Sequence, residues 1–249
     1  MQMMQWIYLS PHLDDAVYSC GGLIWEQTQA GHTVDIWTVC AGDPPPGPLS
    51  PFAEALHARW ETGPEAGQAR RAEDQRAASR LGAGIRHLEL PDCIYRRDPV
   101  SGKALYASEE AIFGEVDPAE GGVMDWLKKL IAEQVPAETE IIAPLTVGGH
   151  VDHRLVRATF ERSGRGGRFY ADYPYAGYAD AKIEDRVPPG WTADIFPVST
   201  AGMQAWGDAA ALYVSQMSTF WANRAGMMAA LRTYVALAGG IRLWRPTFR

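Results

Sequence analysis

The sequence has few of the residues that build disulfide frameworks and thiol-based metal sites. Its 249 residues include three cysteines, Cys20, Cys40 and Cys93, and no two of them form a Cys-x-x-Cys pair. This sparse set excludes a disulfide scaffold. We expect Cys20 and Cys40 to pack in the core as small apolar residues.

Four further absences narrow the class of protein. No apolar run reaches the roughly 18 residues that a membrane-spanning helix needs, and the N-terminus lacks the charged region and cleavage site of a signal peptide. We therefore expect no membrane insertion and a cytoplasmic location. No Gly-x-Gly-x-x-Gly follows the first predicted strand, which argues against a dinucleotide. The formal charge is −7 and no basic cluster stands out, which argues against nucleic acid as a partner.

The remaining composition is ordinary for a globular protein with a large core, with 47% hydrophobic and 21% charged residues. Patterning predicts strands near residues 6–9, 34–39, 87–90, 139–145, 168–175 and 192–198, and helices near 16–30, 64–82, 124–133, 152–162, 202–217 and 219–237. Short apolar strands that alternate with helices predict a mostly parallel sheet with helices on both faces. No linker or internal repeat is evident, so we expect residues 1–249 to form a single α/β domain with a C-terminal helical elaboration.

The first candidate site follows the first predicted strand. Residues 6–22 read WIYLSPHLDDAVYSCGG, in which His12, Asp14 and Asp15 lie between the strand and a helix. Polar side chains at the carboxyl end of a strand stand where open α/β sheets bind ligands. His12 and Asp15 are three residues apart, so both can reach one metal ion while Asp14 points elsewhere. On this stretch alone, helix capping by an aspartate is an alternative.

A second cluster follows the predicted strand that ends at Leu145. Residues 146–156 read TVGGHVDHRLV, with His150 and His153 three apart and Asp152 between them. His12, Asp15 and His153 together supply two imidazoles and one carboxylate, the ligand set of a catalytic zinc site that leaves the fourth position to water. The same set also suits iron(II). Two such clusters, each at a strand end before a helix, are hard to explain as caps.

SPHLDD followed by SCGG, and then GGHVDH, resemble the PIG-L/LmbE-like family of zinc-dependent N-deacetylases, which remove acetyl groups from amino sugars. The first motif of the family usually reads His-Pro-Asp-Asp followed by Glu, whereas Leu13 and Ala16 stand at the proline and the glutamate here. The metal and base positions are intact, so these departures bear on subfamily and substrate. The resemblance implies a Rossmann-like sheet whose first and fourth strands are adjacent, at the point where the strand order reverses.

The resemblance also suggests two substrate-binding residues. Arg70 and Glu73 match the Arg-x-x-Glu spacing of the family, which implies that Arg70 points toward the sugar. A surface or structural ion pair is the alternative. Asp92 follows the strand predicted at 87–90, on the same rim as the metal ligands, and resembles a family acid that bonds sugar hydroxyls. Its alternative role is that of a turn residue.

The mechanism we expect is metal-assisted amide hydrolysis. Zinc on the three ligands lowers the pKa of bound water toward about 7, and Asp14 takes the proton of that water as general base. Zinc and His150 stabilise the oxyanion, and protonated Asp14 or His150 delivers a proton to the leaving amine. Asp152 is expected to orient one of the histidines.

The expected substrate is a small-molecule N-acetyl amino sugar or sugar conjugate. Two alternatives are an amidase for another acyl amide, such as a thiol conjugate or an antibiotic scaffold, and a non-catalytic protein that binds metal or sugar. Retention of Asp14 argues against the second alternative, because metal binding does not require it. Tyr173 and Tyr175 either line the sugar site or pack in the core. The sequence leaves open the oligomeric state, a homo-oligomer included, and whether residues 42–64 and 95–122 close over the substrate.

Overall fold

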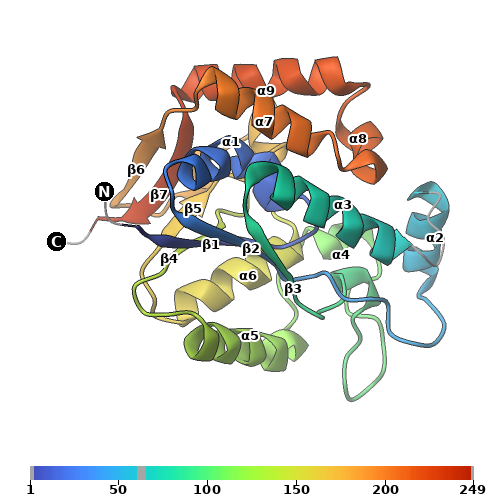
Figure 1. Ribbon diagram of the computed structural model, residues 1–249. Helices are drawn as coiled ribbons and strands as arrows, with labels where there is room; N and C mark the ends of the chain where they lie inside the picture. Colours follow the sequence, from blue (N-terminus) through green and yellow to red (C-terminus); the bar gives the residue numbers. More distant parts are fainter. Residues whose placement is uncertain (1–2, 61–65, 248–249) are drawn as a thin grey trace.

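A seven-stranded sheet forms the centre of the molecule (Figure 1), whose computed structural model describes residues 3–60 and 66–247. The strand order is β3-β2-β1-β4-β5-β7-β6. The first five strands pair in parallel, whereas β7 runs antiparallel to both of its neighbours. The strands are β1 (Gln5–Ser10), β2 (Thr33–Thr38), β3 (Gly84–His87), β4 (Glu140–Pro144), β5 (Arg168–Tyr170), β6 (Trp191–Phe196) and β7 (Ile241–Pro246).

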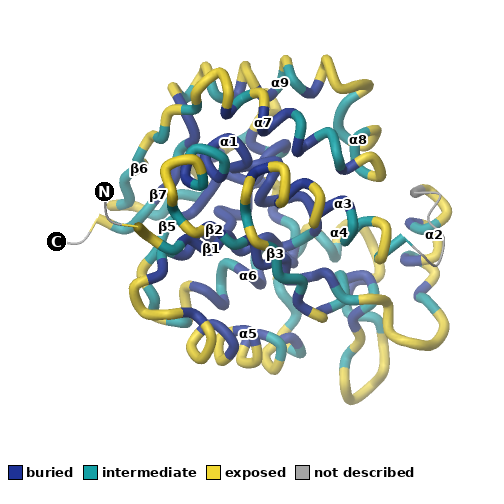
Figure 2. The backbone as a smooth tube through the Cα atoms, in the orientation of Figure 1, coloured by how far each residue is buried: buried dark blue, intermediate teal, exposed yellow. Residues whose placement is uncertain are grey.

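Helices cover both faces of this sheet, with α1, α3, α7 and α9 on one side and α5 and α6 on the other (Figure 1). Figure 2 shows that the central strands and the inner faces of these helices are buried, while the edge strands β3 and β6 are intermediate to exposed and the outer faces of α5 and α9 are exposed. The helices are α1 (Asp15–Gln29), α2 (Pro51–Trp60), α3 (Ala66–Leu81), α4 (Glu109–Ile112), α5 (Gly121–Gln134), α6 (Val151–Arg162), α7 (Thr200–Ala210), α8 (Val214–Phe220) and α9 (Arg224–Ala238). The predicted α/β architecture is confirmed. None of the helices within the described ranges is long and apolar enough to cross a membrane.

The strand order reverses between β1 and β4. Trp6 in β1 pairs with Val34 of β2 on one side and with Glu140 of β4 on the other. The chain proceeds outward through β2 and β3 and then returns to β4 and β5. The carboxyl ends of β1 and β4 therefore lie side by side, which is where doubly wound sheets bind their ligands. The predicted adjacency of the first and fourth strands is confirmed.

Several predicted boundaries were wrong. The third strand ends at His87 instead of beginning there, and the fifth ends at Tyr170 instead of residue 175. The helix predicted at 202–217 is two helices, because the chain turns inward at Tyr213, whose hydroxyl donates to the buried Asp74 over 2.5 Å. The last helix begins at Arg224.

Three elements were missed, and one of them is the short helix α4 in the region 95–122. Helix α2 lies within the region read as a loop, 42–64, of which residues 61–64 fall outside the described ranges. The helix predicted at 64–82 is described from Ala66 onward. Strand β7 lies between β5 and β6, so the C-terminal elaboration adds a strand pair to the sheet as well as helices.

Candidate functional site

A cavity of about 560 Å³ opens at the carboxyl ends of β1 and β4. It brings together seven of the eight site residues predicted from the sequence: His12, Asp14, Asp15, Arg70, Asp92, His150 and His153. The eighth, Asp152, is fully buried and contacts two of the histidines. The topology of the sheet therefore joins two motifs that lie well over a hundred residues apart.

The loop after β1 holds its two aspartates in different ways. The Ser10 hydroxyl donates to the carbonyl of His12 over 2.7 Å and accepts from the amide of Ala16 over 3.0 Å, which fixes the turn into α1. The His12 amide donates to Asp15 Oδ2 over 2.8 Å. Asp14 precedes the helix, yet its side chain makes no capping hydrogen bond. The capping alternative is therefore wrong for Asp14.

Asp14 has a strained backbone. Its φ is 133°, a value that few residues with a side chain adopt. Burial, and after it the charge of Asp15, raises the pKa of the Asp14 carboxyl well above its usual range. A strained, partner-poor carboxyl that lines a cavity is typical of a functional residue.

Two histidine rings face the carboxylate of Asp15. Nε2 of His12 lies 2.8 Å from Asp152 Oδ2, and Nδ1 of His153 lies 2.6 Å from Asp172 Oδ1. A carboxylate only accepts hydrogen bonds, so a neutral ring keeps its proton on the nitrogen that faces it. The other nitrogen of each ring then has a free lone pair: Nδ1 of His12, 3.4 Å from Asp15 Oδ2, and Nε2 of His153, 3.3 Å from the same oxygen.

The field at this position strongly favours positive charge. Burial by itself would lower the pKa of His153, but the charge of Asp15 and the hydrogen bonds to Asp15 and Asp172 raise it to about 10. For Asp15, burial acts to raise the pKa, and the charges and hydrogen bonds of His153 and His12 outweigh it and hold that pKa well below its usual range. The same negative charges would stabilise a divalent cation bound at this position.

His150 is oriented differently. It is the N-cap of α6, where its Nδ1 accepts a hydrogen bond from the Asp152 amide over 3.2 Å. An amide N–H can only donate, so the proton of the neutral ring lies on Nε2. Burial, and after it the charge of His12, lowers the pKa of His150 to about 4. The ring is therefore neutral near pH 7 and carries its N–H on Nε2.

The structure allows more than one metal-ligand set among the described residues. Single ring nitrogens of His12, His150 and His153 lie within 4.8 Å of one another, and two further groups combine Asp152 with a cysteine and one histidine. The predicted set replaces His150 with Asp15, whose Oδ2 lies within 3.4 Å of a nitrogen on each of the other two histidines. A metal ligand at Nε2 of His150 would need that nitrogen unprotonated, which conflicts with the hydrogen bond at Nδ1.

Two charged residues of the site were missed from the sequence as functional residues. Arg96 is buried and pairs with Asp152 over 2.6 Å and with Glu120 over 2.7 Å. It stands in the polar run YRRDP, which reads as surface. Asp172 orients His153 and accepts from the Val147 amide over 2.8 Å. Its position at the end of β5, on the same rim as both motifs, was the signal that could have identified it.

Arg70 lines the cavity, and the alternative of an ion pair with Glu73 is not observed among the described residues. Its NH2 group lies 3.4 Å from the carbonyl of Leu13, and its Nε has no hydrogen-bond partner among the described residues. Glu73 instead accepts from the Ser215 amide over 3.0 Å and from its hydroxyl over 2.6 Å, which ties α3 to α8. An Arg70–Glu73 ion pair is thus absent from the described part of the chain.

Asp92 is a turn residue and also lines the cavity. Its Oδ1 accepts from the Ile94 amide over 3.2 Å, as a turn residue does, while its Oδ2 lies 3.6 Å from His12 Nε2 and lines the cavity. The two tyrosines divide between the proposed roles. Tyr175 lines the cavity, whereas Tyr173 is buried and stacks on Trp221.

Comparison with known proteins agrees with this site. The family PIG-L, GlcNAc-PI de-N-acetylase, matches residues 7–162, which contain both motifs. A 2'-N-acetylparomamine deacetylase of Niallia circulans is 29% identical over 205 residues, which cover 74% of this chain and 71% of that protein. A protein of the same name from Streptomyces fradiae is 33% identical over 189 residues, which cover 72% of this chain and 61% of that protein.

A solved structure extends the likeness over nearly the whole chain. The zinc-inhibited form of teicoplanin deacetylase Orf2 has a TM-score of 0.79 and 28% identity, over 98% of this chain and 97% of that one. The matched family segment covers more than half of the chain and includes every metal-ligand candidate of the two motifs. The chain therefore belongs to the PIG-L family of GlcNAc-PI de-N-acetylases and is an N-deacetylase hydrolase.

Proposed function

We propose that this protein removes the acetyl group from an N-acetylated amino sugar or sugar conjugate, with a divalent metal ion held by His12, Asp15 and His153. The observation that carries the proposal is the convergence of two imidazole lone pairs on the Asp15 carboxylate at 3.4 and 3.3 Å, inside a cavity of about 560 Å³. Relatives that act on 2'-N-acetylparomamine and teicoplanin support the substrate class.

The donor set fits a metal of the zinc type. Two imidazoles and a carboxylate suit zinc or iron(II), and each imidazole donates its other N–H to a buried carboxylate, as ligand histidines in metal sites usually do. When bound, the ion would supply Lewis acidity to the amide carbonyl and would make a water molecule easier to deprotonate.

Two side chains of the cavity would carry the protons. Asp14 faces the cavity beside the ligand Asp15 and is free of any capping bond, so it can accept a proton from the attacking water. His150 presents Nε2–H, a donor that can stabilise negative charge on the amide oxygen or protonate the leaving amine. The buried Asp152 holds His12 on one side and is itself held by Arg96.

The sugar would be held by groups on the rim of the cavity. Arg70 lines the cavity with its guanidinium, and Asp92 has an oxygen that is not used in its turn. Both can hydrogen-bond sugar hydroxyls without touching the scissile bond. The ring of Tyr175 provides a face against which a sugar can stack.

The test is release of a primary amine and acetate from a panel of N-acetyl amino sugars and their conjugates. Longer N-acyl analogues, a thiol conjugate and an acylated antibiotic scaffold are included, to separate the alternative amidase activities. We expect turnover of N-acetyl sugars that disappears on chelation and returns with zinc. Turnover confined to the other amides would contradict the sugar assignment, and full activity after complete metal removal would contradict the metal assignment.

A further inference from the structure

The site cavity is the first of three that adjoin one another. A second cavity, of about 520 Å³, shares Tyr175 with the site cavity, and a third, of about 380 Å³, shares Asp185 and Arg186 with the second. All three border the loop that carries the second motif or the start of the helix after it. A larger substituent of an N-acetyl sugar bound at the site would enter the second cavity if it passed Tyr175.

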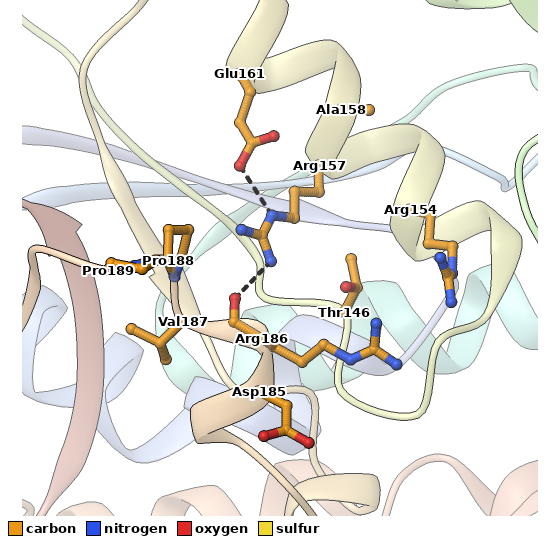
Figure 3. Close-up of a pocket in the computed structure, with 10 residues that line it drawn as sticks. All are labelled: Thr146, Arg154, Arg157, Ala158, Glu161, Asp185, Arg186, Val187, Pro188 and Pro189. Carbon is orange, nitrogen blue, oxygen red and sulfur yellow. Dashed lines mark hydrogen bonds and ion pairs between the residues drawn. The ribbon is translucent and has the colours of Figure 1, made fainter.

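Three arginines line the third cavity, and they differ in how many of their N–H donors are already hydrogen-bonded (Figure 3). Arg157 forms the most bonds of the three: its Nε pairs with Glu161 over 2.9 Å, and its NH1 donates to the carbonyls of Leu145 and Arg186 over 2.8 and 3.0 Å. It fastens the segment that carries Arg186 to the end of β4. Arg157 thus holds this backbone in place through Nε and NH1, and NH2 is the one nitrogen of its guanidinium without a hydrogen bond among the described residues.

The other two arginines use fewer of their N–H donors within the protein. Arg154 uses Nε on the Gly149 carbonyl over 2.9 Å and NH1 on Glu115 over 2.7 Å, which leaves NH2 open. The guanidinium of Arg186 has no hydrogen bond or ion pair within the part of the chain that the structure describes. Figure 3 shows the two guanidinium groups facing each other, with the Asp185 carboxylate lying away from them.

The NH2 groups of Arg154 and Arg186 both lie close to Gly149. The NH2 atoms of Arg154 and Arg186 lie 3.2 and 3.3 Å from the position that a Cβ on Gly149 would take. Gly149 has a φ of 81°, so the backbone there suits glycine and leaves the space open. The positive charges of the two guanidinium groups repel each other. An anion bound between them would accept a charge-assisted hydrogen bond from each and offset this repulsion.

We propose that Arg154 and Arg186 bind an anionic group, a carboxylate or a phosphate, on the part of the substrate beyond the N-acetyl sugar. This inference rests on the proposed function for its sugar and adds the chemical class of the distal substituent. Guanidinium groups are suited to both anions, because their planar N–H donors match two oxygens of either group. Arg157 positions the pair by holding the backbone at Arg186.

The experiment uses N-acetylglucosaminides whose aglycones are carboxyalkyl chains of increasing length, each beside its methyl ester. We expect the wild-type protein to prefer the acid over the ester in kcat/KM by about ten-fold or more at the best chain length, since one charge-assisted hydrogen bond contributes roughly that factor. Arg186→Ala should remove the preference. The exposed Arg232→Ala on α9 makes the same change of charge outside these cavities and should keep it.

Two outcomes would overturn the proposal: the wild type shows no preference for the acid at any chain length, or Arg186→Ala keeps the preference. In the first case, a change in the turnover of the esters on addition of inorganic phosphate would mean that the pair binds a free anion.

Failure of the proposed function is recognised separately, as no turnover of any glycoside by the wild type. Calorimetry with the matching amine products then tests the anion site directly. Acids that bind at least about ten-fold more tightly than esters, in the wild type but not in Arg186→Ala, support it. Equal affinities for acid and ester refute it.

Discussion

Asp14 has a backbone conformation that glycine would adopt with less strain. Its φ of 133° and ψ of −32° place a residue with a Cβ in a sparsely populated region, at a typical cost of about 1–3 kcal/mol. Its carboxylate makes no capping bond, so removal takes no hydrogen bond from α1. Burial, followed by the charge of Asp15, also disfavours ionisation of the group, as its raised pKa shows. We therefore expect Asp14→Gly to stabilise the fold.

The expected gain follows from two opposing terms. Relief of strain contributes about 1–3 kcal/mol, and the greater freedom of glycine in the unfolded chain takes back about 0.5–1 kcal/mol. The difference is a rise of about 1 kcal/mol in the free energy of unfolding. In a protein of 249 residues this corresponds to an increase in Tm of about 2–4 °C.

The same substitution should abolish most of the activity. A general base contributes about 10²–10⁴-fold to the rate, so kcat should fall by that factor in Asp14→Gly and in Asp14→Asn, while both keep their metal. Urea unfolding of the metal-free protein measures stability, elemental analysis measures the metal content, and amine release measures turnover. A variant that is more stable and nearly inactive would show that the strain at Asp14 serves catalysis.

The matched control is Ala229→Gly, an exposed position inside α9 with helical backbone. It should lose about 1 kcal/mol and keep full activity. If Asp14→Gly is destabilised as much as Ala229→Gly, the strain argument is wrong. If Asp14→Asn turns over near the wild-type rate, Asp14 is not the general base.

Three further predictions concern the ligands and the rim. His153→Ala should lose most of the bound metal while His150→Ala keeps it and loses kcat; elemental analysis giving the reverse would favour the three-histidine set. Asp172→Asn should weaken metal affinity by about 10–100-fold, because His153 loses the carboxylate that fixes its tautomer; competition with a chelator measures this, and unchanged affinity would refute the role. Arg70→Ala should lower kcat/KM on N-acetyl sugars at normal metal content, and a value equal to wild type across the panel would remove Arg70 from the sugar site.

The sequence was sufficient for the sheet and for the two motifs, since both depend on local patterns. Apolar strands that alternate with helices specify a parallel sheet, and a parallel sheet places all its strand ends on one rim. Residue pattern alone could therefore assign His12, Asp15 and His153 to one site. The missed helix α2 and strand β7 have weak local patterns. Strand β7 in particular owes its place to pairing with β5 and β6.

The buried charges show where local patterns stop being informative. Arg96 and the exposed Arg97 are neighbours in the sequence, and nothing local distinguishes them. Arg96 is buried because Asp152 and Glu120, 56 and 24 residues away respectively, meet it in the fold. A buried charge is tolerated only where such partners exist, and partners distant in sequence leave no periodic signal.

The tautomers of the three histidines were decided by tertiary structure alone. His12 and His150 lie just before α1 and α6, His153 lies in the first turn of α6, and the residue type alone does not say which nitrogen of each ring carries the proton. The ring nitrogen that is left with a lone pair depends on the group that faces the other nitrogen: Asp152 for His12, across 140 residues, Asp172 for His153, and a backbone amide for His150. Sequence determined that these residues meet at one strand edge. Hydrogen bonds formed only in the folded chain determine which of them can bind a metal and which can donate a proton, because a tautomer is set by its partner and not by the residue itself.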